Sequence, residues 1–181
     1  MCGGRGTRLG GETEKPLVAV DGVATVDRVC DALAASRVDD VYAAVSPHTP
    51  ATRAHLRERE VTVLDTPGEG YVSDLTAALD RVGRPAVTVA ADLPLLASES
   101  VNDVLDAASG SLVVAVPVDL KRRLGVSVDT TLEREGRALA PTGVNVVAAG
   151  DDDVYVSDDP RLAVNVNRPR DLWVAETVGC N

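Results

Sequence analysis

Phenylalanine is absent from the sequence, and all aromatic residues together make up only 2% of its 181 residues. Because hydrophobic residues still account for 45% of the chain, a buried core has to be built mainly from alanine, valine and leucine. A chain of this length buries a substantial core as one domain of ordinary size. We therefore predict a single domain that covers residues 1–181.

Lysine is also scarce, with 2 lysines and 16 arginines against 19 aspartates and 9 glutamates. The formal net charge is −10 and the pI is near 4.6. Without a basic stripe to neutralise phosphates, the sequence argues against a nucleic acid as a partner. An Asp-rich, Lys-poor surface suits a protein that its charge keeps soluble at high salt, and so predicts a halophilic source. GC-rich codon usage is the alternative explanation of the same composition.

Long apolar runs and paired metal ligands are missing too. No signal peptide and no run of about 20 apolar residues occurs, which predicts a cytoplasmic protein without a membrane span. The three cysteines (Cys2, Cys30 and Cys180) lie far apart and form no C-x-x-C motif. Neither a disulfide framework nor a zinc site is therefore indicated. The two histidines, His48 and His55, stand in no ligand-like setting.

Glycine, in contrast, is concentrated at the start of the chain. Five glycines lie within the first eleven residues, among Arg5 and Arg8, and the segment ends at Lys15. Glycine lets the backbone turn sharply, so that consecutive N–H groups can form a concavity for an anion, and the basic side chains supply charge for a polyphosphate. A disordered N-terminus or a tight turn is the alternative. The residues predicted to bind the polyphosphate ligand here are Gly3, Gly4, Gly6, Thr7, Arg8 and Lys15.

The glycine spacing fits neither the G-x-x-x-x-G-K-[ST] phosphate loop nor the G-x-G-x-x-G dinucleotide fingerprint. A phosphate loop of this kind normally follows a buried strand, yet only Met1 and Cys2 precede this one. Either the domain lacks its first strand or the true start lies upstream of Met1. We favour the second explanation, because such a loop needs an anchored entry to hold its geometry.

Apolar runs alternate with helical patterns after the loop. Runs typical of strands lie at 17–20, 41–45, 61–64, 86–91, 112–118, 143–149 and 164–166. Helical patterns lie at 24–36, 51–59, 72–82, 98–108 and 169–178, and residues 133–137 resemble a hairpin turn. This order predicts an α/β fold with a mainly parallel, Rossmann-like sheet and helices on both faces.

Polar turns follow three of the predicted strands, at 46–50, 65–71 and 92–94. Ligands gather beyond the carboxyl ends of the strands in an open parallel sheet, so these turns and the glycine loop are expected to meet at one edge. Asp92 directly follows the run Val-Thr-Val-Ala-Ala. A carboxylate at the end of such a strand is suited to hold Mg²⁺ against triphosphate oxygens. An aspartate that only caps the following turn is the alternative.

Two amides, Asn165 and Asn167, lie on the same face of a short predicted strand before the last helix. They would complete a metal or phosphate shell, and Asn167 is predicted as a second metal ligand; a structural turn is the alternative. Asp65 and Asp74 are ambiguous, because either can cap a turn or a helix instead of contacting a ligand.

Taken in order, these segments resemble the nucleotidyltransferases that move NMP from an NTP onto a phosphate. The G-G-x-G-T-R loop with Glu14-Lys-Pro-Leu17, and the N-x-N-x-P-x-D-L segment at 165–172, are shared broadly among such enzymes. The segments 46–50, 65–71 with Asp74-Leu75, and 141–147 are similar to the archaeal cobinamide-phosphate guanylyltransferase branch, a relative of molybdenum-cofactor guanylyltransferase. The match covers nearly the whole chain and departs from the family at the first strand and at 119–138.

The resemblance implies a fold of the nucleotide-diphospho-sugar transferase type and the transfer of GMP from GTP to adenosylcobinamide phosphate, a corrinoid phosphate acceptor. The products would be adenosylcobinamide-GDP and pyrophosphate, in the assembly of the cobalamin nucleotide loop. Arg8, Lys15 and Asp92 would be catalytic, with Asp92 and Asn167 on Mg²⁺. The nucleotide would further contact Ser46, Thr49, Asp65, Gly68, Gly70 and Tyr71, and the acceptor Thr142, Gly143 and Asn145.

Other functions share parts of the same pattern. A molybdenum-cofactor guanylyltransferase or a sugar-1-phosphate nucleotidyltransferase would share the front half of the chain, and a non-catalytic GTP-binding regulatory module is an alternative of another class. A homodimer is expected from relatives alone.

Overall fold

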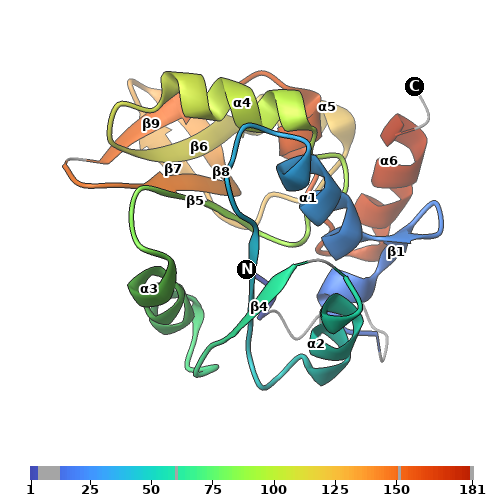
Figure 1. Cartoon of the computed structure of the whole chain (residues 1–181). Helices are drawn as coiled ribbons and strands as arrows, with labels where there is room; N and C mark the ends of the chain where they lie inside the picture. Colours follow the sequence, from blue (N-terminus) through green and yellow to red (C-terminus); the bar gives the residue numbers. More distant parts are fainter. Residues whose placement is uncertain (4–12, 60, 151, 180–181) are drawn as a thin grey trace.

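Strands and helices alternate along the chain in the computed structural model, which describes residues 1–3, 13–59, 61–150 and 152–179 (Figure 1). The strands are β1 (Ala19–Val20), β2 (Val23–Ala24), β3 (Tyr42–Val45), β4 (Thr62–Asp65), β5 (Ala86–Val89), β6 (Ser111–Pro117), β7 (Leu132–Arg134), β8 (Arg137–Val147) and β9 (Asp152–Val156). The helices are α1 (Thr25–Ala34), α2 (Pro50–Arg57), α3 (Tyr71–Val82), α4 (Ser98–Ala107), α5 (Val118–Leu124) and α6 (Pro169–Gly179), with 3₁₀ turns η2 (Lys15–Leu17) and η3 (Pro160–Ala163). Within these described ranges, no helix has the length and apolar character needed to cross a membrane.

The strands form a mixed sheet rather than the mainly parallel one expected from the sequence. β3 pairs with β4 in parallel, and the larger set has the order β5-β8-β6-β9, with β7 beside β8. β8 runs antiparallel to β5, β6 and β7, whereas β6 and β9 are parallel. The α/β class is confirmed. The parallel expectation was wrong for β8, because its apolar pattern indicates burial but not the direction in which the strand returns between β5 and β6.

The first three residues lie between β3 and β5 and connect the two sets of strands. The N–H of Cys2 donates to the carbonyl oxygen of Ala44 at 2.8 Å, and the terminal amine of Met1 donates to that of Val89 at 2.8 Å. The N–H of Ala91 donates in turn to the carbonyl oxygen of Met1 at 3.2 Å. These hydrogen bonds are those of a parallel strand that lies between β3 and β5.

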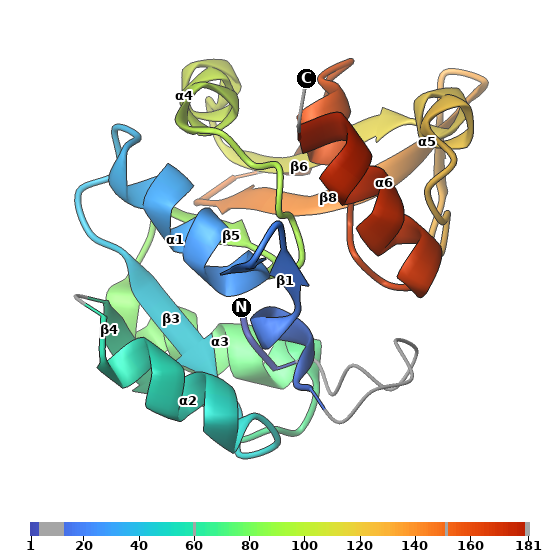
Figure 2. The same cartoon turned by 90° about the vertical axis from the view of Figure 1, so that its right-hand side faces the viewer.

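An apolar groove of about 430 Å³ continues between β3 and β5 from Met1. α1 and α2 lie on one face of β3 and β4, and α3 lies on the other (Figures 1 and 2), as the prediction of helices on both faces requires. Val29 and Leu33 of α1 and Ala78 and Leu79 of α3 line the groove. The groove therefore has the lining of a strand position that is covered on both faces.

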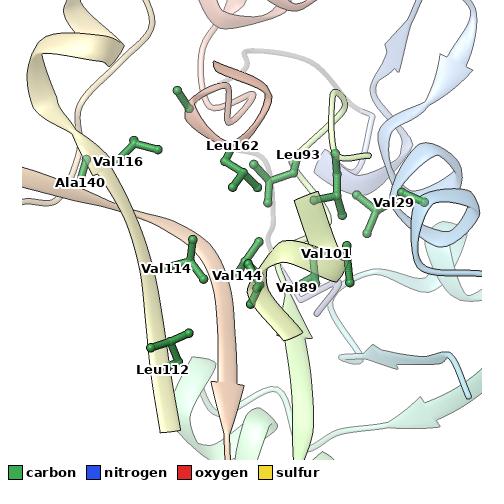
Figure 3. Packing of buried hydrophobic residues seen from close by; sticks show 14 of the residues in the cluster. Val29, Val89, Leu93, Val101, Leu112, Val114, Val116, Ala140, Val144 and Leu162 are labelled. Atoms are coloured by element: carbon green, nitrogen blue, oxygen red, sulfur yellow. The ribbon is translucent and has the colours of Figure 1, made fainter. Parts of the chain in front are cut away.

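The main hydrophobic core lies among β6, β8, α1 and α4. Val114 of β6 and Val144 of β8 are fully buried, and they face a space shared with Val101 and Leu162 (Figure 3). The buried side chains are mainly valine, leucine and alanine, as the composition predicts. The single tryptophan, Trp173 on α6, is 65% exposed.

Most predicted elements are present with shifted ends. The patterns at 24–36 and 72–82 correspond to α1 and α3, and the hairpin predicted at 133–137 joins β7 to β8. Glu135 and Gly136 have φ angles of 52° and 73°, the conformation of a two-residue hairpin turn. α5 and β9 were not predicted, and the strand predicted at 164–166 is not formed in the described chain.

Candidate active site

A hollow of about 460 Å³ lies where the ends of β3, β4 and β5 meet the start of the chain. It is built from turns that follow strands, as expected for the ligand-binding edge of an α/β sheet. The predicted site residues that line it are Gly3, Lys15, Gly68, Gly70, Tyr71 and Asp92. The structure thus brings together part of the glycine loop, the turn at 65–71 and the turn at 92–94.

Lys15 is the centre of the polar contacts in this hollow. Its Nζ donates to Asp92 Oδ2 and to Asn167 Oδ1, each at 2.5 Å. The side chains of Lys15 and Asp92 are 21% and 14% exposed, so bulk water screens the pair less than it would a surface ion pair. Two oxygen atoms from separate segments therefore converge on one cationic nitrogen.

Glu14 fixes the backbone next to Lys15. Its carboxylate accepts the N–H groups of Ala51 at 2.9 Å and Thr52 at 2.7 Å, and the Thr52 hydroxyl at 2.6 Å. These bonds cap the first turn of α2, which has no side-chain cap from its own N-cap residue. Burial raises the pKa of Glu14, but the hydrogen bonds from Thr52 and Ala51 outweigh it and leave the pKa below its ordinary value.

The turn at 65–71 is held by α3 and by the turn after β3. Asp74 Oδ1 accepts the N–H of Gly68 at 2.7 Å, and His48 Nε2 lies 3.0 Å from the carbonyl oxygen of Gly68. Gly68 has a φ of +78°, and a Cβ there would lie 2.8 Å from the ring of Pro47, so glycine is required. Asp74 is 6% exposed and its Oδ1 holds this turn, which agrees with a capping role.

A set of polar groups on the interior side supports Asp92. Asn165 Nδ2 donates to Asp92 Oδ1 at 3.2 Å and to the carbonyl oxygen of Thr142 at 2.8 Å. Lys121 Nζ in turn donates to Asn165 Oδ1 at 3.0 Å. Each carboxylate oxygen of Asp92 therefore accepts a hydrogen bond, one from Lys15 and one from the interior.

Several predicted site residues do not line the hollow: Ser46, Thr49, Asp65, Thr142, Gly143, Asn145 and Asn167. Asn167 contacts Lys15, which does line it. The hydroxyl of Thr49 donates to the carbonyl oxygens of Cys2 and Ser46, so it ties the turn after β3 to the start of the chain. Asp65 forms an ion pair with Arg53. These contacts give Thr49 and Asp65 structural partners within the protein.

The residues on β8 that were predicted to bind the acceptor substrate also have contacts within the protein. The Thr142 hydroxyl donates to the carbonyl oxygen of Val114 at 3.0 Å, and the residue is fully buried. Gly143 has a φ of +88°, and a Cβ there would lie 2.8 Å from the Cβ of Ala90. Asn145 Nδ2 lies 3.5 Å from the hydroxyl of Thr88 on β5. Thr142 and Gly143 thus shape the backbone behind Asp92.

Four predicted residues of the glycine loop (Gly4, Gly6, Thr7 and Arg8) lie outside the described residues. Their predicted contacts with phosphate remain predictions. Gly3 is described, and a Cβ placed on it would lie 3.4 Å from Asp74 Oδ2 and 3.5 Å from Ser46 Oγ.

From the sequence, no site role was assigned to Glu14 or Asp171, although both belong to motifs that carry the family resemblance, and Lys121 was not singled out. Asp171 accepts the N–H groups of Asn167 at 3.0 Å and Arg168 at 2.9 Å, and so holds the segment that carries the Asn167 amide. Lys121 could have been noticed as one of only two lysines in an acidic chain. For Glu14 and Asp171 the motifs themselves were the available signal, but a motif position does not show that a carboxylate holds a backbone segment.

The donor set near Lys15 fits a divalent cation that arrives with a polyphosphate. Within the described ranges, no group of three His, Cys, Asp or Glu side chains is placed to hold a metal ion. Asp92 Oδ2 and Asn167 Oδ1 nevertheless converge on the Lys15 ammonium, which marks a point where protein oxygens stabilise positive charge. One carboxylate and one amide oxygen suit Mg²⁺, which takes its remaining ligands from phosphates and water.

An α/β sheet with a lysine–carboxylate pair and glycine turns at one edge is the architecture expected of a nucleotide-binding transferase domain. The chain belongs to the family of MobA-like NTP transferase domains, whose family model matches residues 1–155. Adenosylcobinamide-phosphate guanylyltransferase from Methanocaldococcus jannaschii is 31% identical over 192 residues, which cover 97% of this chain and 93% of that protein.

Solved structures agree on the fold. A hypothetical transferase from Thermus thermophilus superposes with a TM-score of 0.68 at 18% identity and covers 90% of this chain and 91% of its own. A nucleotidyl transferase from Methanothermobacter thermautotrophicus gives a TM-score of 0.66 at 17% identity, over 98% of this chain and 95% of its own. At these identities the likeness establishes the architecture alone.

Proposed function

We propose that the protein transfers GMP from GTP to adenosylcobinamide phosphate, giving adenosylcobinamide-GDP and pyrophosphate. The observation that carries the transferase chemistry is the meeting of Lys15 and Asp92 in one hollow, although they lie 77 residues apart in the sequence. The choice of substrates is supported by the similarity to the guanylyltransferase from M. jannaschii over 97% of the chain.

The reaction needs positioning and charge stabilisation rather than a protein nucleophile. An oxygen of the acceptor phosphate attacks the α-phosphorus of GTP and forms a new P–O bond. The bond from the α-phosphorus to the oxygen bridging to the β-phosphorus breaks, and its electron pair leaves with pyrophosphate. Lys15 would stabilise the negative charge that develops on the transferred and departing phosphates, and Arg8 would clamp the pyrophosphate.

Asp92 and Asn167 would hold Mg²⁺ beside the triphosphate, with the geometry of their oxygens set by the contacts already described. The ion would supply charge to the phosphate oxygens in the transition state. Lys15 now contacts the same two oxygens, so its ammonium would turn toward the phosphates when nucleotide enters.

The nucleotide would occupy the hollow between Gly3 and the turn at 65–71. Gly68, Gly70 and Tyr71 would face the nucleoside, and Tyr71, which is 53% exposed, offers a ring at the opening. Ser46, Thr49 and Asp65 would lie behind Gly68, Gly70 and Tyr71 and would support the nucleoside pocket through their contacts within the protein. Thr142, Gly143 and Asn145 would shape the acceptor side through the position of β8 rather than by direct polar contacts with the acceptor.

The test is to incubate the protein with GTP, Mg²⁺ and adenosylcobinamide phosphate and to follow pyrophosphate release and the mass of the product. We expect turnover with GTP and little with ATP or CTP. Molybdopterin and a sugar 1-phosphate should be poor acceptors, and turnover with either one instead would assign the alternative transferase. GTP binding without turnover on any acceptor would favour the regulatory module.

Asp92→Asn is the sharpest variant for this chemistry. We expect turnover to fall by at least about 100-fold, because the amide removes a negative metal ligand worth several kcal/mol in the transition state. Asp119→Asn, which removes an exposed carboxylate that is 75% accessible on α5, should leave turnover unchanged. If Asp92→Asn kept full turnover, the metal assignment would be wrong.

A further inference from the structure

A buried ammonium lies behind the candidate active site. Lys121 on α5 is 4% exposed, and its Nζ donates to the carbonyl oxygen of Ala163 at 2.8 Å and to Asn165 Oδ1 at 3.0 Å. Burial lowers the pKa of Lys121, and the carboxylates of Asp171, Asp92 and Asp129, in that order, oppose this shift. A charged group is costly to bury, so its retention at this place calls for a role.

The ammonium helps to set which way the amide of Asn165 points. A lysine ammonium has only donors, so it requires the carbonyl end of the amide on its side. The NH₂ end of Asn165 then has to face Thr142 and Asp92, where it donates to the Thr142 carbonyl oxygen at 2.8 Å and to Asp92 Oδ1 at 3.2 Å. A flipped amide would place its NH₂ against the Lys121 ammonium and its oxygen against both the Asp92 carboxylate and the Thr142 carbonyl oxygen, which makes three repulsive contacts.

The amide of Asn165 in turn helps to orient the carboxylate of Asp92. One carboxylate oxygen is held by the N–H of Asn165, so the other, Oδ2, is directed toward Lys15. The backbone of the same residue is also held, because the N–H of Val166 donates to the Asp92 carbonyl oxygen at 2.9 Å. The rotation of the carboxylate therefore depends on Lys15 on one side and on the Asn165 amide, with Lys121 behind it, on the other.

We propose that Lys121 is a positioning residue for the transferase reaction: acting through Asn165, it orients the Asp92 carboxylate toward the metal and the triphosphate. This inference rests on the proposed function. The alternative is that Lys121 only ties α5 to η3 through the Ala163 carbonyl oxygen.

The test is Lys121→Met, which keeps a long side chain and removes the ammonium. Pyrophosphate release is measured against Mg²⁺ concentration at saturating GTP and acceptor, and Mn²⁺ binding in the presence of GTP is measured by calorimetry. We expect half-saturation by either metal to shift upward by about 10- to 100-fold, as for groups that orient a metal ligand, with little change in KM for GTP. A role limited to tying α5 to η3 would lower the melting temperature without this selective loss of metal affinity.

A double variant distinguishes the two roles further. In an Asp92→Asn background, Lys121→Met should cause no additional loss of metal affinity, because the carboxylate that it orients is gone. The matched control is Arg122→Met on the same helix. It removes an exposed cation that pairs with Asp119 at the surface, and it should leave the metal titration unchanged.

Two results would overturn the inference: an unchanged metal titration in Lys121→Met, or an equal loss in the wild-type and Asp92→Asn backgrounds. If Lys121→Met does not fold, Asn165→Ala leaves Lys121 bonded to the Ala163 carbonyl oxygen and should show the same weakened metal binding; unchanged binding there also overturns it. Failure of the proposed function is seen separately, as absence of turnover in the wild type, since the Mn²⁺·GTP titration needs no acceptor.

Discussion

A strand added in front of Met1 should stabilise the protein by filling the groove between β3 and β5. The antiparallel ladder of β5 with β8 leaves the backbone groups of Val87 and Val89 on the groove side. The parallel ladder of β3 with β4 likewise leaves those of Tyr42 and Ala44 on that side. Met1 already donates a hydrogen bond to Val89 and Cys2 donates one to Ala44. An extension would therefore continue the hydrogen bonding to β5 on one side and to β3 on the other.

The size of the effect follows from the lining of the groove. Four valines placed before Met1 would put two side chains against α1 and two against α3, and burying them contributes about 6 kcal/mol at the lower end of the usual range. New ladder hydrogen bonds add about 2 kcal/mol. Ordering four residues costs about 5 kcal/mol. The net gain of about 3 kcal/mol corresponds to a rise in Tm of roughly 6–12 °C for a domain of this size.

The assay is thermal unfolding followed by circular dichroism, with a Gly-Ser-Gly-Ser extension of equal length as the control. In the valine-extended chain, Ala78→Asp should abolish the gain, because Ala78 is buried on α3 and lines the groove. A valine extension that melts with the Gly-Ser control would refute the idea that the groove accepts a strand.

Three smaller predictions concern single residues. Glu14→Gln should lose about 1 kcal/mol of unfolding free energy at about pH 7, the size of a helix cap. Hydrogen bonds outweigh burial and lower the pKa of Glu14 in the folded protein, so its contribution to the free energy of unfolding is complete above the ordinary pKa of 4.5. That contribution is lost as the pH falls through the lowered pKa. If urea melts gave the same difference in unfolding free energy between variant and wild type at about pH 3 as at about pH 7, this account would be wrong. Burial and then the neighbouring Cys2 raise the pKa of Cys30 to about 11, so a thiol reagent at about pH 8 should modify this thiol only as fast as the protein unfolds. Rapid labelling of Cys30 itself in the native protein, located by peptide mass mapping, would disprove its burial. Gly143→Ala should cost ~1–3 kcal/mol in thermal melts, since it has a positive φ and no room for a Cβ beside Ala90, and an unchanged Tm would show that β8 can shift.

Periodicity and strand ends were enough to predict the elements that surround the hollow. α1 and α3 could be located because their apolar residues recur at helical spacing, and the turns at 65–71 and 92–94 because polar residues follow apolar runs. The direction of β8 could not be predicted, since an antiparallel return through the sheet leaves the same apolar sequence as a parallel one.

The sequence indicated the part of the candidate site in which charged and amide side chains follow strands or glycine turns. The hydrogen bonds from Lys15 to Asp92 and Asn167 bring together a residue predicted to bind phosphate and two residues predicted to hold a metal. The backbone hydrogen bonds of the Thr49 and Thr142 hydroxyls could not be predicted, because a threonine that bonds to backbone and one that bonds to a ligand look alike in sequence. The groups that support the site, such as Lys121, depend on tertiary packing that no local pattern encodes.

The exposed position of Trp173 has a practical consequence for spectroscopy. Indole emission from the sole tryptophan of the chain starts from a wet environment on α6, so its wavelength should change little when the core opens. The same ring would respond strongly to anything that covers α6, which makes intrinsic fluorescence a poor gauge of melting and a sensitive gauge of association at that helix.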